Sequence, residues 1–178
     1  MRMRINQFLV LTGLTAVETL RQPICLILVT SCLAFIALLP VLITHTLGEG
    51  IKLVRDSALA IHFVSGLILG SYAACATLSH EIRRGTAAAV LSKPVNREIF
   101  FLAKYAGIAV VLALFSLAVG LATLLSGRTV HSAYSADWWS LSTILVSIGA
   151  AFLMAGLANY FLRRPFSSTA FVLLLCFL

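Results

Sequence analysis

The chain has 178 residues, of which 61% are hydrophobic and 11% are charged, whereas soluble domains carry about 25% charged residues. A soluble domain of this length has too little interior to bury so much apolar surface. The composition therefore excludes a soluble fold and predicts an all-α, polytopic helical membrane protein, in which the net charge of +7 reflects topology rather than nucleic-acid binding.

The N-terminal residues 5–22 predict a helix that lies in the membrane interface. One side of this helix is polar and the other is apolar, and three arginines accompany it, which is typical of interfacial helices. The polar side consists of Gln7, Thr12, Thr15, Glu18, Thr19 and Gln22, and the arginines are Arg2, Arg4 and Arg21. The alternative is a solvated leader without a membrane role.

Four apolar runs are long enough to cross a hydrocarbon core of about 30 Å. They are residues 24–43, 58–78, 105–125 and 141–162. A fifth run begins at residue 166 and reaches residue 178, which gives roughly 20 Å of helix and an incomplete span. We therefore expect the sequence to be a fragment of a longer membrane domain.

Small residues recur every four positions in two of the predicted spans, and such spacing lets helices approach closely. These residues are Gly66, Gly70 and Ala74, and then Ser147, Ala151 and Ala155. We expect His62 to be interfacial or hydrogen-bonded, because no second His or acid accompanies it. The four cysteines (Cys25, Cys32, Cys75, Cys176) all lie in apolar runs and are interpreted as small core residues. No metal site is predicted.

The distribution of positive charge predicts the orientation of the chain. Ten of the thirteen Lys and Arg residues lie on the side of the N-terminus and of the segment 79–104, and three lie on the other side. Because cytoplasmic segments carry the excess of Lys and Arg, the N-terminus and the segment 79–104 are predicted to be cytoplasmic.

The segment 79–104 is the longest charged stretch between apolar runs and is predicted to form two short helical pieces that meet at a Ser-Lys-Pro corner. Lys93 precedes Pro94, which disfavours helix there, and Gly85 is an expected weak point. Asn96 can cap the next helix, with Glu98 in its first turn. The residues alone leave two interpretations open: a docking element for another protein, or a basic loop that fixes topology and touches lipid phosphates.

A resemblance to known sequences favours the first interpretation. The segment resembles the signature of ATP-binding cassette (ABC) transporter permeases of the type-2 export class, whose pattern is roughly E-x-x-x-G-T, then L-[SA]-[KR]-P-V-[ST]-R, then G-K. The matching residues are Glu81-Ile82-Arg83-Arg84-Gly85-Thr86, Leu91-Ser92-Lys93-Pro94-Val95-Asn96-Arg97 and Lys104-Tyr105. Asn96 and Ala103 depart from the pattern. The helix with Glu18, Arg21, Gln22 and Pro23 is also similar to the interfacial helix of that class.

The resemblance implies a membrane domain of six spans in the inner or plasma membrane of a prokaryote. It also implies that the segment 79–104 is a coupling loop for a separate cytoplasmic ATPase, and that a second permease subunit, identical or different, completes the transporter. The implied interface residues are Glu81, Arg83, Arg84, Gly85, Thr86, Leu91, Ser92, Lys93, Pro94, Val95, Arg97 and Lys104. No GxxxxGK[ST] motif occurs in the sequence, so ATP is expected to bind the partner, with no cofactor bound directly and no enzymatic activity in this chain.

Two other classes of protein remain as alternatives. An ion-coupled secondary transporter would carry acids near the bilayer midplane, and none of the six acids falls within a predicted span. A non-transporting assembly or scaffold protein of the membrane is the other alternative. An intramembrane enzyme is disfavoured, because His62 and Ser71 are about 13 Å apart along one helix.

Overall fold

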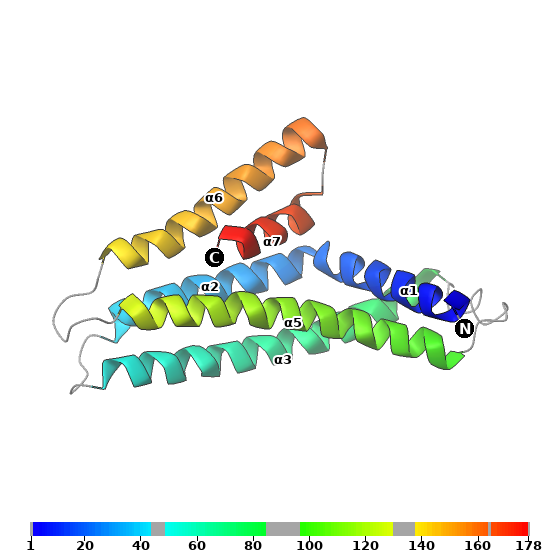
Figure 1. Cartoon of the computed structure of the whole chain (residues 1–178), viewed down its shortest axis with the longest axis horizontal. Helices are drawn as coiled ribbons and strands as arrows, with labels where there is room; N and C mark the ends of the chain where they lie inside the picture. Colours follow the sequence, from blue (N-terminus) through cyan, green and yellow to red (C-terminus); the bar gives the residue numbers. More distant parts are fainter. Residues whose placement is uncertain (1, 44–48, 85–96, 130–137, 164, 178) are drawn as a thin grey trace.

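The computed structural model describes residues 2–43, 49–84, 97–129, 138–163 and 165–177. The elements within these ranges are all α-helices (Figure 1). They are α1 (Arg2–Leu20), α2 (Pro23–Leu42), α3 (Gly50–Arg84), α5 (Arg97–Thr129), α6 (Trp138–Leu162) and α7 (Phe166–Phe177). The expected all-helical class is confirmed.

Four of the helices contain stretches long and apolar enough to cross a membrane: Pro23–Leu42, Gly50–His80, Glu98–Gly127 and Ser142–Leu162. These stretches overlap the four predicted spans. Helices α3 and α5 are longer than the predicted spans 58–78 and 105–125, with 35 and 33 residues, or about 50 Å each. Each of the two helices is therefore longer than the thickness of a hydrocarbon core, which is about 30 Å.

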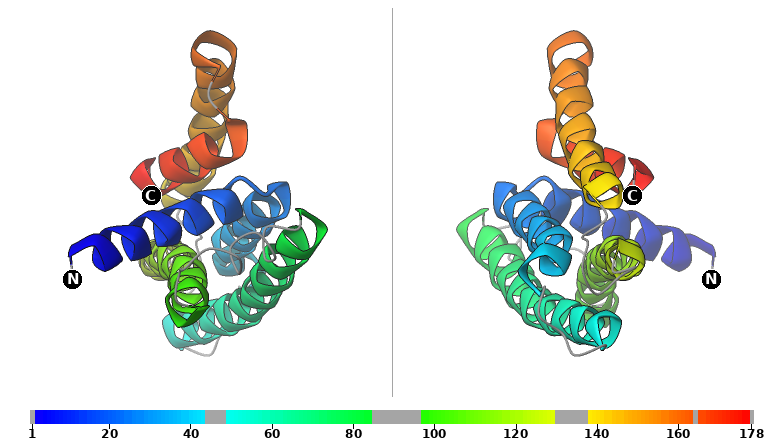
Figure 2. Two further views of the ribbon diagram at one scale, coloured as in Figure 1. Left: turned by 90° about the vertical axis from the view of Figure 1, so that its right-hand side faces the viewer. Right: turned by 90° about the vertical axis from the view of Figure 1, so that its left-hand side faces the viewer.

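Helix α2 lies in the middle of the bundle, with α3 and α5 on one side and α7 on the other (Figures 1 and 2). Its buried residues Leu33 and Ile36 belong to one apolar core that includes Leu69, Phe115 and Leu174. A bend at Arg21 and Gln22 separates α1 from α2. Helix α1 runs obliquely away from α2, so that the N-terminus lies to one side of the bundle (Figure 2).

Polar side chains within the spans are mostly satisfied by neighbouring helices or by their own backbone. The Ser126 hydroxyl donates to the carbonyl of Ile36 at 3.1 Å, and His62 Nε2 lies 3.1 Å from Ser116 Oγ. The expectation of a hydrogen-bonded His62 is therefore confirmed.

The interpretation of the cysteines as small core residues holds for the buried Cys25 and Cys32. It is wrong for Cys75 and Cys176, which are exposed on outward helix faces.

The first stripe of small residues faces α5 over part of its length. A methyl group at Gly66 would lie 3.7 Å from Phe115, and one at Gly70 would lie 3.4 Å from Leu112. Ala74 is exposed, contrary to the predicted packing role, because residues four apart on a helix drift by about 40° per step. The contact face continues through Ala73 and Thr77 instead.

The second stripe lies on α6. Ala151 and Ala155 are fully buried, and Ala155 packs with Leu26 of α2 and Ala170 of α7. Ser147 is half-buried, and its hydroxyl donates to the carbonyl of Ile144 at 2.7 Å. Helix α6 diverges from the α3–α5 side of the bundle, and α7 folds back between α6 and α2 (Figure 1).

The turn between α6 and α7 begins with a residue in the left-handed region. Arg163 has φ 52°, and its N–H donates to the carbonyl of Asn159 at 3.1 Å. A left-handed residue after the last helical turn is a common helix ending, normally occupied by glycine. The turn then brings Phe166 to within 5.9 Å of the Phe152 ring, centroid to centroid.

Candidate coupling site at the loop end

The end of the bundle where α3 finishes at Arg84 and α5 begins at Arg97 is called the loop end here. Of the predicted coupling residues, Gly85, Thr86, Leu91, Ser92, Lys93, Pro94 and Val95, with the corner and cap expected there, lie outside the described residues. Glu81, Arg83 and Arg84 lie in the last turn of α3, and Arg97 begins α5. Arg83 is exposed. Glu98 occupies the first turn of α5, as predicted.

Helix α1 packs along the first half of α5 at the loop end, and glycine permits a close crossing there. A methyl group at Gly107 would lie 2.7 Å from Thr15 Cβ and 2.9 Å from the carbonyl oxygen of Thr12. Carbon atoms in contact prefer about 3.5–4.0 Å. Only glycine therefore fits at this point of α5 without a displacement of α1.

Two threonines of α1 are buried in the bundle, and one of them, Thr15, lies at the crossing with α5. Thr15 and Thr19 are almost fully buried, and each hydroxyl donates to the carbonyl four residues earlier, at 3.0 Å for Thr15 and 2.9 Å for Thr19. These local bonds satisfy the hydroxyl donors, so the threonines can be buried at little cost. The polar side predicted for this helix thus serves in part for helix packing.

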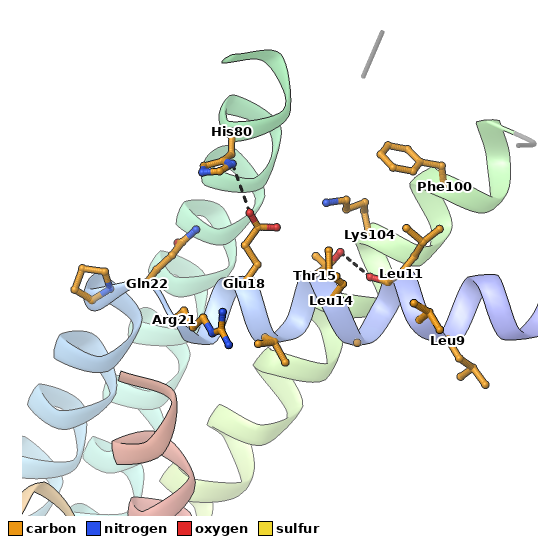
Figure 3. A pocket seen from close by; sticks show the side chains of 14 residues that line it. Leu9, Leu11, Leu14, Thr15, Glu18, Arg21, Gln22, His80, Phe100 and Lys104 are labelled. Carbon is orange, nitrogen blue, oxygen red and sulfur yellow. Dashed lines mark hydrogen bonds and ion pairs between the residues drawn. The ribbon is translucent and has the colours of Figure 1, made fainter. Parts of the chain in front are cut away.

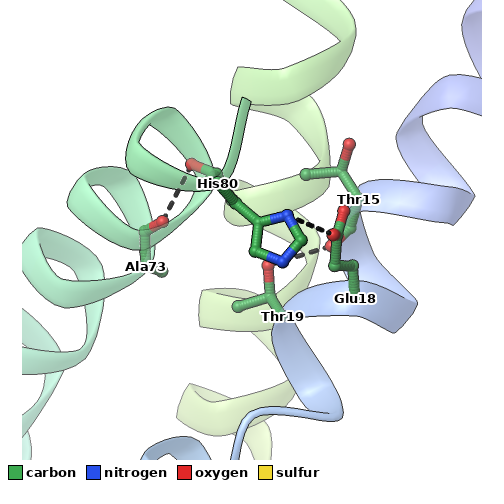
Figure 4. Close-up of polar contacts among 6 residues, drawn as sticks. Thr15, Glu18, Thr19, Ala73 and His80 are labelled. Carbon is green, nitrogen blue, oxygen red and sulfur yellow. Dashed lines mark hydrogen bonds and ion pairs between the residues drawn. The ribbon is translucent and has the colours of Figure 1, made fainter. Parts of the chain in front are cut away.

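A polar contact joins α1 to the end of α3. His80 Nδ1 lies 3.5 Å from Glu18 Oε1, and both side chains are partly exposed (Figure 4). The contact is an ion pair when His80 is protonated. Glu18 sits between the buried Thr15 and Thr19 on α1, so its carboxylate is held near α3 while α1 rests on α5.

An open groove of about 930 Å³ follows the exposed side of α1. Figure 3 shows Glu18, Gln22, His80 and Lys104 on one side of α1, with Leu9 on the opposite side. Further apolar lining comes from Val10, Leu14, Val17 and Phe100. The groove therefore has a polar part, contributed by three helices, and an apolar part contributed mainly by α1, with Phe100 of α5.

Two features define the polar part of the groove. The Lys104 ammonium lies 5.8 Å from the centroid of the Phe100 ring, which is within the range of a cation–π contact. Gln22 Oε1 is buried and has no hydrogen-bond partner among the described residues. A buried acceptor without a donor costs about 1–3 kcal/mol.

The bend between α1 and α2 is tied to α7. The Ser167 hydroxyl donates to the carbonyl of Arg21 at 2.8 Å, and the Gln22 N–H donates to Thr19 at 3.1 Å. Pro23 then starts α2, where its fixed φ suits the first helical position and its missing N–H is not needed.

The structure brings together two parts of the sequence that were singled out separately: Glu18, Arg21, Gln22 and Pro23 on one side, and Lys104 on the other. The contact roles of Gly107 and His80 were missed. Glycine is common in apolar helices, so Gly107 gave no signal, and its role depends on α1, nearly a hundred residues earlier. In the described ranges, no group of three or more His, Cys, Asp or Glu side chains could hold a metal ion.

The fold and this site define a polytopic, all-helical membrane protein in which an N-terminal helix packs on α5 beside the end of α3. The chain belongs to the family described as ABC-2 family transporter protein, whose sequence profile matches residues 9–178. It is thus a membrane-spanning permease component of ABC transport, a role that is itself not catalytic. No curated protein and no solved structure gives a significant match.

Proposed function

We propose that the chain is the permease subunit of an ATP-driven exporter, and that residues 79–104 couple it to a separate cytoplasmic ATPase. The observation that supports this proposal is that two long helices flank the segment 85–96: α3 ends at Arg84 and α5 begins at Arg97. Long helices are stiff, so a displacement at the loop end reaches the spans directly. The excess of Lys and Arg at this end supports a cytoplasmic location.

The proposed division of labour leaves ATP binding and hydrolysis to the partner. Arg83, Arg84, Lys93 and Arg97 would meet acidic residues at the rim of an ATPase groove, and Leu91, Pro94 and Val95 would enter it as apolar anchors. Closure of two ATPase subunits would push the loops of two permease subunits, identical or different. The spans would then switch between inward- and outward-open states in a prokaryotic inner membrane.

The test is affinity purification of the tagged, full chain from native membranes, followed by mass spectrometry. The double variant Leu91→Asp, Pro94→Gly is compared with the parent chain. The matched control is Leu53→Asp, which places the same new charge at an exposed position near the opposite end of α3. We expect an ATPase to accompany the parent and the control, and to be lost from the loop variant.

Recovery of the ATPase with the loop variant at the parental level would contradict the proposed coupling role. The absence of any ATPase after cross-linking of the parent would instead favour a membrane assembly protein. The comparison of the loop variant with the parent requires that the variant inserts normally into the membrane. Normal insertion is measured by the yield of the variant in the membrane fraction and by its elution as a single species in detergent.

A further inference from the structure

The polar residues of the groove around α1 come from one end of three spans. Glu18 and Gln22 lie just before α2, which starts at Pro23. His80 ends the apolar stretch of α3, and Lys104 lies near the start of the apolar stretch of α5, which begins at Glu98. In a bilayer, the ends of spans mark the level where hydrocarbon meets the headgroups. The groove therefore lies at headgroup level.

The apolar side chains in the groove are so exposed that contact with water would be unfavourable for them. Leu14 and Val10 on α1 are 60% and 67% exposed, and Leu9 and Val17 are also exposed. Burial of one such side chain is worth about 1.5–3 kcal/mol, and an interfacial helix obtains this energy by placing its apolar face among acyl chains. A water-soluble partner protein would leave that face uncovered on the membrane side.

The polar part of the groove is cationic. Its charged residues are Glu18, Arg21 and Lys104, with His80. Glu18 is engaged by His80, whereas Arg21 makes no ion pair among the residues that the structure describes. Lys and Arg at headgroup level attract acidic lipids, by about 1 kcal/mol each.

Gln22 restricts the chemistry of the ligand further. Its buried Oε1 is an acceptor without a donor in the described part of the chain. A headgroup that carries hydroxyls supplies such a donor, and one that ends in a trimethylammonium group does not. The groove thus combines an apolar wall, positive charge and a vacant acceptor, and residues on both the apolar and the polar side of α1 line it.

We propose that this groove binds an acidic glycerophospholipid with hydroxyl donors in its headgroup, in the leaflet at the loop end. The acyl chains lie against Leu9, Leu14 and Val17, and the headgroup reaches Gln22 and Lys104 on the other side of α1. The bound lipid holds α1 in the interface. This inference does not depend on ATP coupling.

The test uses the full chain reconstituted in nanodiscs that hold equal amounts of phosphatidylglycerol, phosphatidylethanolamine and phosphatidylcholine. The protein is then extracted in mild detergent, and the retained lipid is measured by mass spectrometry. We expect phosphatidylglycerol to be enriched over phosphatidylcholine by the parent. Lys104→Gln should lower the enrichment about fivefold, since it removes one interfacial charge worth about 1 kcal/mol.

Two further variants separate hydrogen bonding from charge. Gln22→Leu removes the acceptor and leaves every charge in place, so it should lower the enrichment about two- to tenfold, as for one lost hydrogen bond. Lys52→Gln is the matched control, because Lys52 pairs with Glu49 at the opposite end of α3. It should leave the enrichment unchanged.

Equal retention of the three lipids by the parent would overturn the proposal, as would an enrichment that survives both Lys104→Gln and Gln22→Leu. Displacement of the retained lipid by the ATPase subunit would also overturn it, because the groove would then be a protein interface. The loop variant Leu91→Asp, Pro94→Gly should retain the lipid whether or not it binds an ATPase. This variant distinguishes failure of the lipid site from failure of the coupling role.

Discussion

Substitution of Gly107 by alanine tests whether α1 is fixed to α5. The added methyl group would meet Thr15 Cβ at 2.7 Å, the Thr12 carbonyl oxygen at 2.9 Å and Thr15 Cγ2 at 3.0 Å. One of these three atoms belongs to the backbone of α1 and cannot rotate away. The crossing must therefore open by several tenths of an ångström, or α1 must leave α5.

The expected cost is obtained from two opposing contributions. Overpacking of a tight contact costs about 1–3 kcal/mol, whereas alanine is better than glycine inside a helix by about 0.5–1 kcal/mol. At the midpoints of these two ranges, the net destabilisation of the docked α1 is about 1 kcal/mol, or a factor of about 5 in the ratio of docked to undocked helix.

Hydrogen–deuterium exchange of the full chain in detergent measures this ratio. We expect the amides of α1 to exchange about five times faster in Gly107→Ala, with little change in α6. Gly120→Ala is the matched control on the same helix, because no atom lies within 4 Å of the added methyl group. Equal exchange of α1 in the two variants would refute the close-crossing argument.

Two smaller effects are also expected. Arg163→Gly should raise the unfolding free energy by about 1 kcal/mol, measured by thermal unfolding in detergent, because glycine adopts the observed φ of 52° without strain. No rise would mean that the Arg163 side chain contributes an offsetting contact. A double-mutant cycle with Glu18→Gln and His80→Gln should give a coupling below about 1 kcal/mol that weakens with salt, since both side chains are partly exposed. A coupling of several kcal/mol would contradict this view of the pair.

The spans could be predicted from the sequence because hydropathy reports directly on the bilayer. The helix ends next to the segment 85–96 were also predicted, because Gly85 was the expected weak point and Asn96 the expected cap; α3 ends at Arg84 and α5 begins at Arg97. Gly66 and Gly70 were predicted as packing residues and do face α5. Ala74 fails because a spacing of four residues does not follow one helix face for long.

The candidate site was harder to predict than the spans because its residues come from distant parts of the chain. The resemblance singled out Glu18 and Lys104 for separate reasons, and only the fold places both in the groove around α1. The polarity of Thr15 and Thr19 suggested a solvated face, yet their hydroxyls are satisfied within α1 and the residues are buried. Local hydrogen bonding of this kind leaves no trace in an amphipathic pattern.

The contacts of α1 differ in strength, and this difference bears on the proposed coupling. The crossing at Gly107 is held by close backbone approach, whereas the Glu18–His80 pair is partly exposed and weak. A displacement of the start of α5 would therefore carry α1 with it, while α3 can separate from α1 at little cost. Because the Ser167 hydroxyl holds the carbonyl of Arg21, movement of α1 would reach α7 through the bend. Under the proposed coupling, the loop end would thus act on the spans through α5 and α1 together.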